Sequence, residues 1–175
     1  MDLYGIIQRE LNKCVDDIKR RHVQAGQRAT GRTMNALEVR MKQEGGRIVG
    51  EIWGMPYTGA WETGSKPASK RNSDAERKMF VQNLKEWCAI RGLTAGMTDK
   101  QAENFARYLA WYIKRYGSAL YRKGGRRDII TPAIEATKQT LEKTLELYFG
   151  ELIASDMENQ FFNQHATYQF NTAQL

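Results

Sequence analysis

Few side chains in this sequence have the types and spacing that catalysis needs. Glu62, next to Trp61, is the best candidate, because a carboxylate in a hydrophobic setting could act as a general base. The alternative, which we favour, is a loop carboxylate that accepts backbone hydrogen bonds or pairs with a neighbouring subunit. The two histidines are 143 positions apart, and His22 follows a basic helix end, where we expect a surface residue. A triad or a zinc site is therefore not expected.

Motifs of known catalytic classes are absent from the chain. The patterns HExxH, GxSxG, CxxC and the Walker phosphate loop do not occur. Cys14 and Cys88 lie in helical patterns without metal-ligand spacing, and we interpret them as buried thiols of a protein in a reducing compartment. We expect no enzyme activity, no catalytic residue, no cofactor and no metal.

A basic, glycine-containing loop at residues 121–127 is the second candidate site. Such a loop can bind phosphate, but it lacks the eight-residue pattern of a nucleotide-binding phosphate loop. We favour a contact with DNA or with an acidic protein face. The candidate contact residues are Arg122, Lys123, Arg126 and Arg127.

The hydrophobic pattern that must position these residues predicts an α+β fold. Apolar residues at helical spacing predict a helix over 2–23, and alternation predicts a β-hairpin with strands near 37–42 and 48–53. Two capping-box sequences, at 73–76 and 98–101, predict an antiparallel helical hairpin. A last helix is expected from a capping Thr131, followed by Pro132, to about residue 157.

These elements predict one domain over residues 1–157. Residues 66–127 form an inserted helical hairpin and basic loop within that domain, and residues 158–175 form an extended C-terminal arm. No apolar run approaches the roughly 18–20 residues that span a bilayer. The first residues follow an amphipathic pattern rather than that of a signal peptide.

Aromatic residues are concentrated in a glycine-rich loop and in the C-terminal tail. The loop over 53–66 holds two tryptophans and a tyrosine, which is a large apolar surface for a connection, so it packs back on its sheet or docks on a partner. We interpret it as an assembly loop, and we expect Trp61→Ala to weaken assembly while the monomer stays folded. The expected subunit contacts are Tyr57, Trp61, Glu62, Phe161, Phe162, Tyr168 and Phe170.

The net charge of +7 is distributed as a gradient along the chain. Residues 1–65 carry 10 basic and 8 acidic side chains, residues 66–130 carry 15 and 6, and residues 131–175 carry 2 and 6. A basic middle and an acidic end could meet head-to-tail in a ring. The basic segment could equally face nucleic acid or remain a solvated helical surface.

Three short motifs follow one another in an informative order. Thr30-Gly31-Arg32 followed by Leu37 is similar to a T-G-x-L opening, and residues 57–65 are similar to a Y-x-x-x-x-E-x-G-T loop after a hairpin. A helix over 105–117, then a basic glycine stretch and Pro132-Ala133-Ile134, is similar to a closing helix that starts with P-A-I. Together they resemble the tail-completion or neck proteins of tailed bacteriophages, the gp-ten-like head–tail joining family, over residues 1–155.

The resemblance implies a structural virion protein in the neck, tail-completion or connector region. Such a protein would form a homo-oligomeric ring beside portal, neck or tail proteins, around packaged double-stranded DNA and without a membrane. It would be found in the virion, and in the host cytoplasm during assembly. Two other classes remain open: a basic DNA-binding protein outside any virion, and a small hydrolase.

Overall fold

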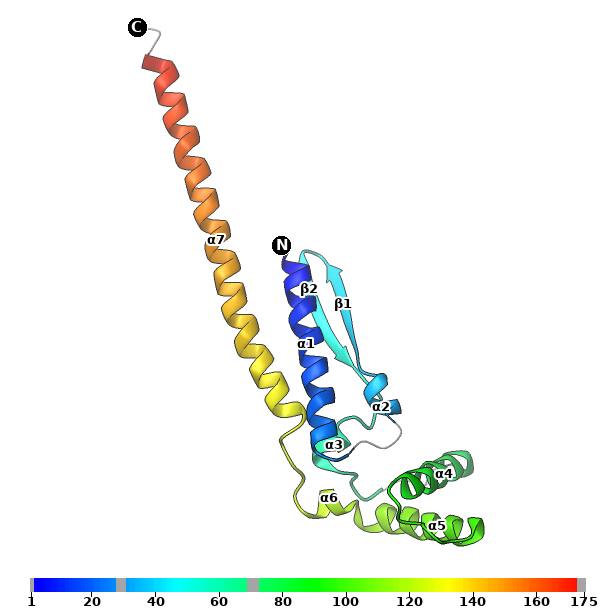
Figure 1. The fold of residues 1–175 in the computed structure, drawn as a ribbon. Helices are drawn as coiled ribbons and strands as arrows, with labels where there is room; N and C mark the ends of the chain where they lie inside the picture. The colour runs from blue at the N-terminus through cyan, green and yellow to red at the C-terminus, as the bar shows by residue number, and fades with distance from the viewer. Residues whose placement is uncertain (1, 28–30, 69–72, 173–175) are drawn as a thin grey trace.

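The computed structural model describes residues 2–27, 31–68 and 73–172, the last eleven of these (162–172) as backbone only. Its elements confirm the α+β class: the chain combines helices with one antiparallel β-hairpin, and a long helix closes it. Thr30 of the predicted T-G-x-L motif lies outside the described residues. Figure 1 shows that α1 lies between the β-hairpin and the first part of the long helix α7.

Helix α1 (Leu3–Gln24) is the central element of the fold. Asp2 caps it, because its carboxylate accepts a hydrogen bond from the Gly5 N–H at 2.8 Å. The apolar residues predicted for this helix do form its buried face, with Cys14, Val15 and Ile18 in the core. One face of α1 covers the hairpin and another receives α7.

The β-hairpin confirms the predicted strands and turn. Strand β1 (Glu38–Glu44) pairs antiparallel with β2 (Arg47–Trp53), and the register pairs Glu44 with Arg47 around a turn of two glycines. A two-stranded sheet is unstable alone in water, so its inner face needs a cover. Helix α1 supplies it: a Cβ added to Gly50 would lie 2.3 Å from Leu11 Cδ1 and 3.1 Å from Ile7 Cγ2.

A helical hairpin extends from the end of this body (Figure 1). It consists of α4 (Asp74–Ile90) and α5 (Asp99–Tyr116), which pack against each other as predicted. Both predicted capping boxes are present, from Ser73 with Glu76 and from Thr98 with Gln101. Three short helices complete the fold: α2 (Arg32–Asn35), α3 (Ala60–Thr63) and α6 (Ala119–Arg122).

Specific contacts attach the helical hairpin to the body. Arg32 Nη2 lies 2.7 Å from Glu86 Oε2, and Arg91 Nη1 donates to the Gly26 carbonyl. The connection that precedes α4 runs beside the end of α5, where the Ala68 N–H donates to the Lys114 carbonyl at 2.9 Å. The hairpin therefore has a defined place at the end of α1 where that helix stops.

Helix α7 (Ile130–Thr172) is longer than the sequence pattern predicted. It comprises 43 residues, so the predicted end near Met157 and the extended arm over 158–175 are wrong as far as Thr172; residues 173–175 lie outside the described residues. The segment 158–172 contains neither glycine nor proline, the residues that end helices most strongly. Despite its polar and aromatic composition, this segment can therefore extend a helix that is already nucleated, because adding residues to a helix costs less than starting one.

The close approach of Gly50 to α1 makes a testable prediction. Gly50→Val should lower the free energy of unfolding by about 1–3 kcal/mol, because the added methyl groups overlap Leu11 and Ile7. Denaturant unfolding followed by circular dichroism measures the change. Val49→Ile is the matched control, since Val49 points to the exposed outer face and should change stability by less than about 0.5 kcal/mol. Equal effects of the two substitutions would contradict the packing described.

Candidate functional site at the start of helix α7

The carboxylate of Glu62 caps the start of α7 from a distant loop. Its Oε1 accepts hydrogen bonds from the backbone N–H groups of Ile129, Ile130 and Thr131, at 2.8, 2.7 and 3.1 Å. Its Oε2 accepts a fourth bond from Thr131 Oγ1 at 2.7 Å. Thr131 was predicted to cap the helix; it instead lies inside the first turn and donates to the residue that does.

Two physical reasons explain why Glu62 occupies this position. The first N–H groups of a helix have no partner within it, and the helix dipole favours a negative charge there. The residue before α7 is Ile129, which is fully buried and has no polar side chain that could serve as a cap. An acceptor from elsewhere in the chain is therefore needed, and α3 places Glu62 against it.

The electrostatics of Glu62 are those of a structural carboxylate. Burial raises its pKa, but the hydrogen bonds from Thr131, Ile129 and Ile130 outweigh burial and hold the pKa below its usual value of 4.5. The side chain is only 8% exposed, and it stays ionised at neutral pH. A general base needs room for a substrate proton, whereas the oxygens of this carboxylate are occupied by four donors of its own chain.

Trp61, the neighbour of Glu62, lies in the core. Its ring stacks on His22 with centroids 3.9 Å apart, and its carbonyl accepts from Gln27 Nε2 at 3.1 Å. Trp61 is 9% exposed and belongs to the same core cluster as Cys14 and Ile129. Trp61 therefore packs within its own chain, on helix α1 rather than on the sheet that the first predicted alternative named, while Tyr57 of the same loop is exposed.

His22 is buried, so its prediction as a surface residue is wrong. The stacked tryptophan covers it, and no hydrogen-bond partner for Nδ1 is present among the described residues. Burial, and then the positive charge of Arg126, lower the pKa of His22 from its usual 6.5. The imidazole is thus neutral at pH 7, as expected of a packing residue in an apolar setting. The predicted buried thiols, Cys14 and Cys88, are confirmed.

The basic loop lies directly against the Glu62 loop. The Arg126 N–H donates to the Glu62 carbonyl at 2.8 Å, and the Arg126 side chain pairs with Asp128. A Cβ at Gly125, whose φ is +79°, would lie 2.7 Å from the same carbonyl oxygen, so this close approach requires glycine. The two loops, which the sequence analysis treated as separate sites, are therefore in contact. Together with the start of α7 they form one structural unit, which we call the joint.

The four predicted basic contacts differ in how available they are. Arg122 lies over the Tyr112 ring, 4.9 Å from its centroid, and donates to Tyr112 Oη at 2.9 Å. Arg126 is half-buried and paired, whereas Lys123 and Arg127 are exposed. Lys123 and Arg127 therefore face outward, where a cation can meet DNA or an acidic surface, whereas Arg122 and Arg126 both contact their own chain.

The predicted subunit contacts also separate into inner and outer residues. Trp61 and Glu62 are covered by their own chain, which accounts for both without a partner. Tyr57 is 54% exposed and Phe161 is exposed on α7. Phe162, Tyr168 and Phe170 lie on the helical backbone of α7, and their side chains are outside the described part of the chain.

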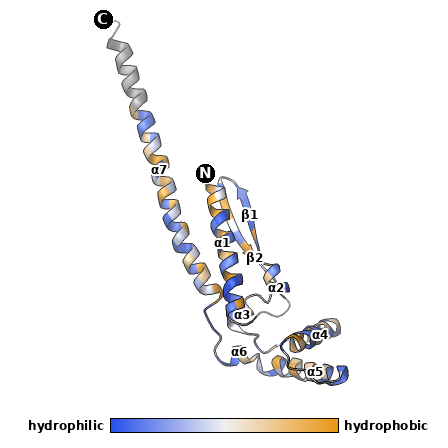
Figure 2. Cartoon of the chain, in the orientation of Figure 1, coloured by the Kyte–Doolittle hydropathy of each residue, from blue (hydrophilic) through white to orange (hydrophobic). Residues whose placement is uncertain are grey.

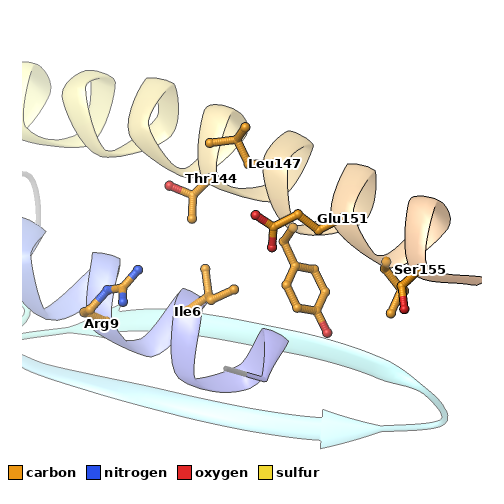
Figure 3. Close-up of a pocket in the computed structure, with 8 residues that line it drawn as sticks. Ile6, Arg9, Thr144, Leu147, Glu151 and Ser155 are labelled. Carbon is orange, nitrogen blue, oxygen red and sulfur yellow. The ribbon is translucent and has the colours of Figure 1, made fainter.

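The hollows beside α7 are shallow. One of about 350 Å³ borders the joint and is lined by Lys66, Tyr121, Arg126, Arg127 and the Glu62 loop. Another, of about 460 Å³, lies away from the joint, where α7 passes the start of α1; Figure 3 shows Ile6 and Arg9 of α1 opposite Thr144 and Glu151 of α7. Among residues 2–27, 31–68 and 73–161, whose side chains are described, no group of three His, Cys, Asp or Glu could hold a metal ion. Over residues 2–27, 31–68 and 73–172, no helix combines the length and hydrophobicity needed to cross a membrane.

Comparison with known proteins adds no relative. No protein-family model, no curated protein and no solved structure matches this chain.

Removing the charge of Glu62 should destabilise the fold in a pH-dependent way. Glu62→Gln should lower the free energy of unfolding at pH 7 by about 1.5–3 kcal/mol, because the helix loses a charged acceptor. Since the pKa of Glu62 is lower in the folded state, its contribution is present above pH 4.5 and is lost as the pH falls through the folded pKa.

Denaturant unfolding of wild type and Glu62→Gln between pH 7 and pH 3 measures this difference. The two curves should converge at acid pH. Glu146→Gln, an exposed carboxylate on the same helix, is the control and should follow wild type throughout. A difference in the free energy of unfolding that stayed constant from pH 7 to pH 3 would mean that the charge of Glu62 does not stabilise α7.

Trp61 and Tyr57 should behave oppositely, although both are aromatic residues of one loop. Trp61→Ala should cost about 3–5 kcal/mol, because it empties the core next to His22. This reverses the expectation that the monomer stays folded. Tyr57→Ala should cost less than about 0.5 kcal/mol. Thermal unfolding of both variants is the measurement, and a Trp61→Ala protein as stable as wild type would place the ring outside the core.

Proposed function

We propose that this protein is a structural component of a tailed-phage particle, one that assembles into a ring at the head–tail junction around the DNA path. The proposal begins from the family resemblance of residues 1–155. The observed order of helix, hairpin, loop and closing helix agrees with the order on which that resemblance was based, and the helical hairpin is an insertion into it.

The observation that carries the proposal is the outer half of α7. Every residue from Glu151 to Phe161 is exposed, including the apolar Leu152, Ile153 and Met157. A helix gains most of its stability from packing an apolar face, and residues 151–160 are exposed and so bury little apolar surface within the single chain. Figure 2 shows that hydrophobic residues recur along α7, also beyond the level of the N-terminal end of α1. A surface of this kind is typical of a subunit that is completed by its neighbours.

The joint at Glu62 supports a structural role over a hydrolase. The carboxylate that would serve as general base is ionised, and four donors of its own chain surround it. The joint fixes the direction in which α7 leaves the body, which is what an assembling subunit needs. The outward cations Lys123 and Arg127 are placed to meet DNA or an acidic neighbour.

The alternative is a DNA-binding protein outside any virion, which the basic residues 107–123 favour. That segment carries five basic and no acidic side chains. A protein of this class would bind duplex DNA as a monomer, with an affinity that falls steeply as salt rises.

Mass and shape of the purified full-length protein test the proposal. We expect one closed oligomer by native mass spectrometry, and rings with a central opening by negative-stain electron microscopy, alone or with virion neck and tail proteins. A protein that stays monomeric with those components, and binds duplex DNA as a monomer, would favour the alternative. Retention of ring formation and of DNA in particles after neutralising Arg122, Lys123, Arg126 and Arg127 would remove the basic loop from the proposal.

A further inference from the structure

We infer that α7 of one copy, over residues 145–161, docks on an aromatic stripe of α5 in the next copy, so that subunits join head-to-tail. The inference rests on the proposed ring, and it names the two surfaces that would form the subunit interface. Most residues of each surface are exposed in the single chain, and the two surfaces complement each other in length, polarity and charge.

The receiving surface is the aromatic stripe of α5, defined by Tyr108, Trp111, Tyr112 and Tyr116. Tyr108, Tyr112 and Tyr116 recur every four residues and so lie along one side of the helix. Their rings form a contiguous group with Trp111, with neighbouring centroids between 4.9 and 6.2 Å apart. Trp111 is 52% exposed, although a tryptophan is among the side chains that gain most from burial.

Helix α4 does not cover this stripe. The residues of α5 that are buried in the helical hairpin are Ala102 and Ala106, which lie on another side of the helix. Cations border the aromatic rings: Arg115 lies 5.7 Å from the Tyr116 centroid and Arg122 lies 4.9 Å from the Tyr112 centroid. The stripe is therefore apolar in the middle and positive at its border, which suits an apolar partner bordered by carboxylates.

Residues 145–161 of α7 form such a partner, with an apolar stripe bordered by carboxylates. Phe149, Ile153 and Met157 recur every four residues, and all three are exposed. From Phe149 to Met157 this stripe is about 12 Å long, the same length as the stripe from Tyr108 to Tyr116 on α5. Glu146 and Asp156 lie three residues from Phe149 and from Ile153, so they border the same side of the helix.

Charge favours α5 as the partner of α7 over a second α7. Residues 144–161 carry four acidic and no basic side chains, whereas residues 107–123 carry five basic and no acidic ones. Two α7 helices side by side would bring like charges together, which is unfavourable, while α7 against α5 pairs opposite charges.

The two surfaces belong to different copies because of their positions in the fold. Figure 1 shows α5 and the outer half of α7 at opposite ends of the molecule, separated by the part of α7 that packs on α1. One chain cannot bring them together without unfolding that helix. A contact between two different surfaces is head-to-tail, and it closes into a ring when the rotation per subunit allows.

Two variants that each remove one surface test the inference. Tyr108→Ala/Trp111→Ala removes the α5 surface, and Ile153→Ala/Met157→Ala removes the α7 surface. Each variant alone should need about tenfold or more higher concentration to assemble, because aromatic and buried apolar contacts dominate interface affinity. Ile134→Ala and Met79→Ala are the controls, since both residues are exposed but lie outside residues 145–161 and outside the aromatic stripe, and they should assemble like wild type.

Mixing the two variants is the decisive measurement. Each variant retains the surface that the other lacks, so an equimolar mixture should form a heterodimer and stop there, as read by native mass spectrometry. Circular dichroism of each variant alone establishes that it is folded. Loss of assembly in the α7 variant but not in the α5 variant, with no heterodimer, would overturn the inference in favour of α7 self-pairing.

The remaining outcomes separate the interface from the proposed function. If both variants form the wild-type ring, the inference fails and the ring stands. If the α5 variant loses binding to duplex DNA but still forms the ring, the stripe is a DNA surface and the inference fails. If wild type grows into filaments of indefinite length and the mixture still stops at two, the interface stands and the closed ring fails. A wild-type protein that stays monomeric at all concentrations overturns both.

Discussion

The architecture depends on one carboxylate that completes a helix remote from it in sequence. Glu62 supplies the acceptors that the first turn of α7 lacks, and it does so from the loop that follows the β-hairpin. The same loop places Trp61 on His22 at the end of α1. Two neighbouring residues therefore fasten α1, the hairpin connection and α7 at one point. Because hydrogen bonds to a buried charge are stronger than neutral ones, this joint is where the fold is most sensitive to substitution and to acid.

Sequence reasoning found what local patterns encode. The amphipathic α1, both strands with their turn, and the two capping boxes each depend on residues a few positions apart, and each is present. The end of α7 was predicted too early because the polar and aromatic composition of the tail is typical of an extended arm. The segment 158–172 nevertheless contains neither glycine nor proline, the residues that end helices most strongly. Propensity alone cannot separate these outcomes when a long helix already leads into the segment.

The candidate site was harder to predict, because its contacts join residues far apart in the sequence: His22 with Trp61, and Glu62 with Ile129, Ile130 and Thr131. Trp61 was expected to contact a partner, and it is instead fixed by His22. Glu62 was expected to accept backbone hydrogen bonds or to pair with a neighbouring subunit; it accepts backbone hydrogen bonds, from the start of α7. A signal was available. An apolar Ile129 precedes a helix start and offers no side-chain cap, so an acid from elsewhere was to be expected. Which acid would serve could not be read from spacing, since tertiary contact decides it.

Because α7 is long, a small rotation at the joint moves its far end by a large distance. A helix of 43 residues is about 65 Å long, so a swing of roughly 10° at its base would carry its tip through about 11 Å. The C-terminal end of α7 keeps a defined position only when the joint is rigid. A more flexible joint would let that end occupy a wide range of positions. A substitution beneath Trp61 could therefore abolish recognition at the far end of the molecule while every residue at that end is unchanged.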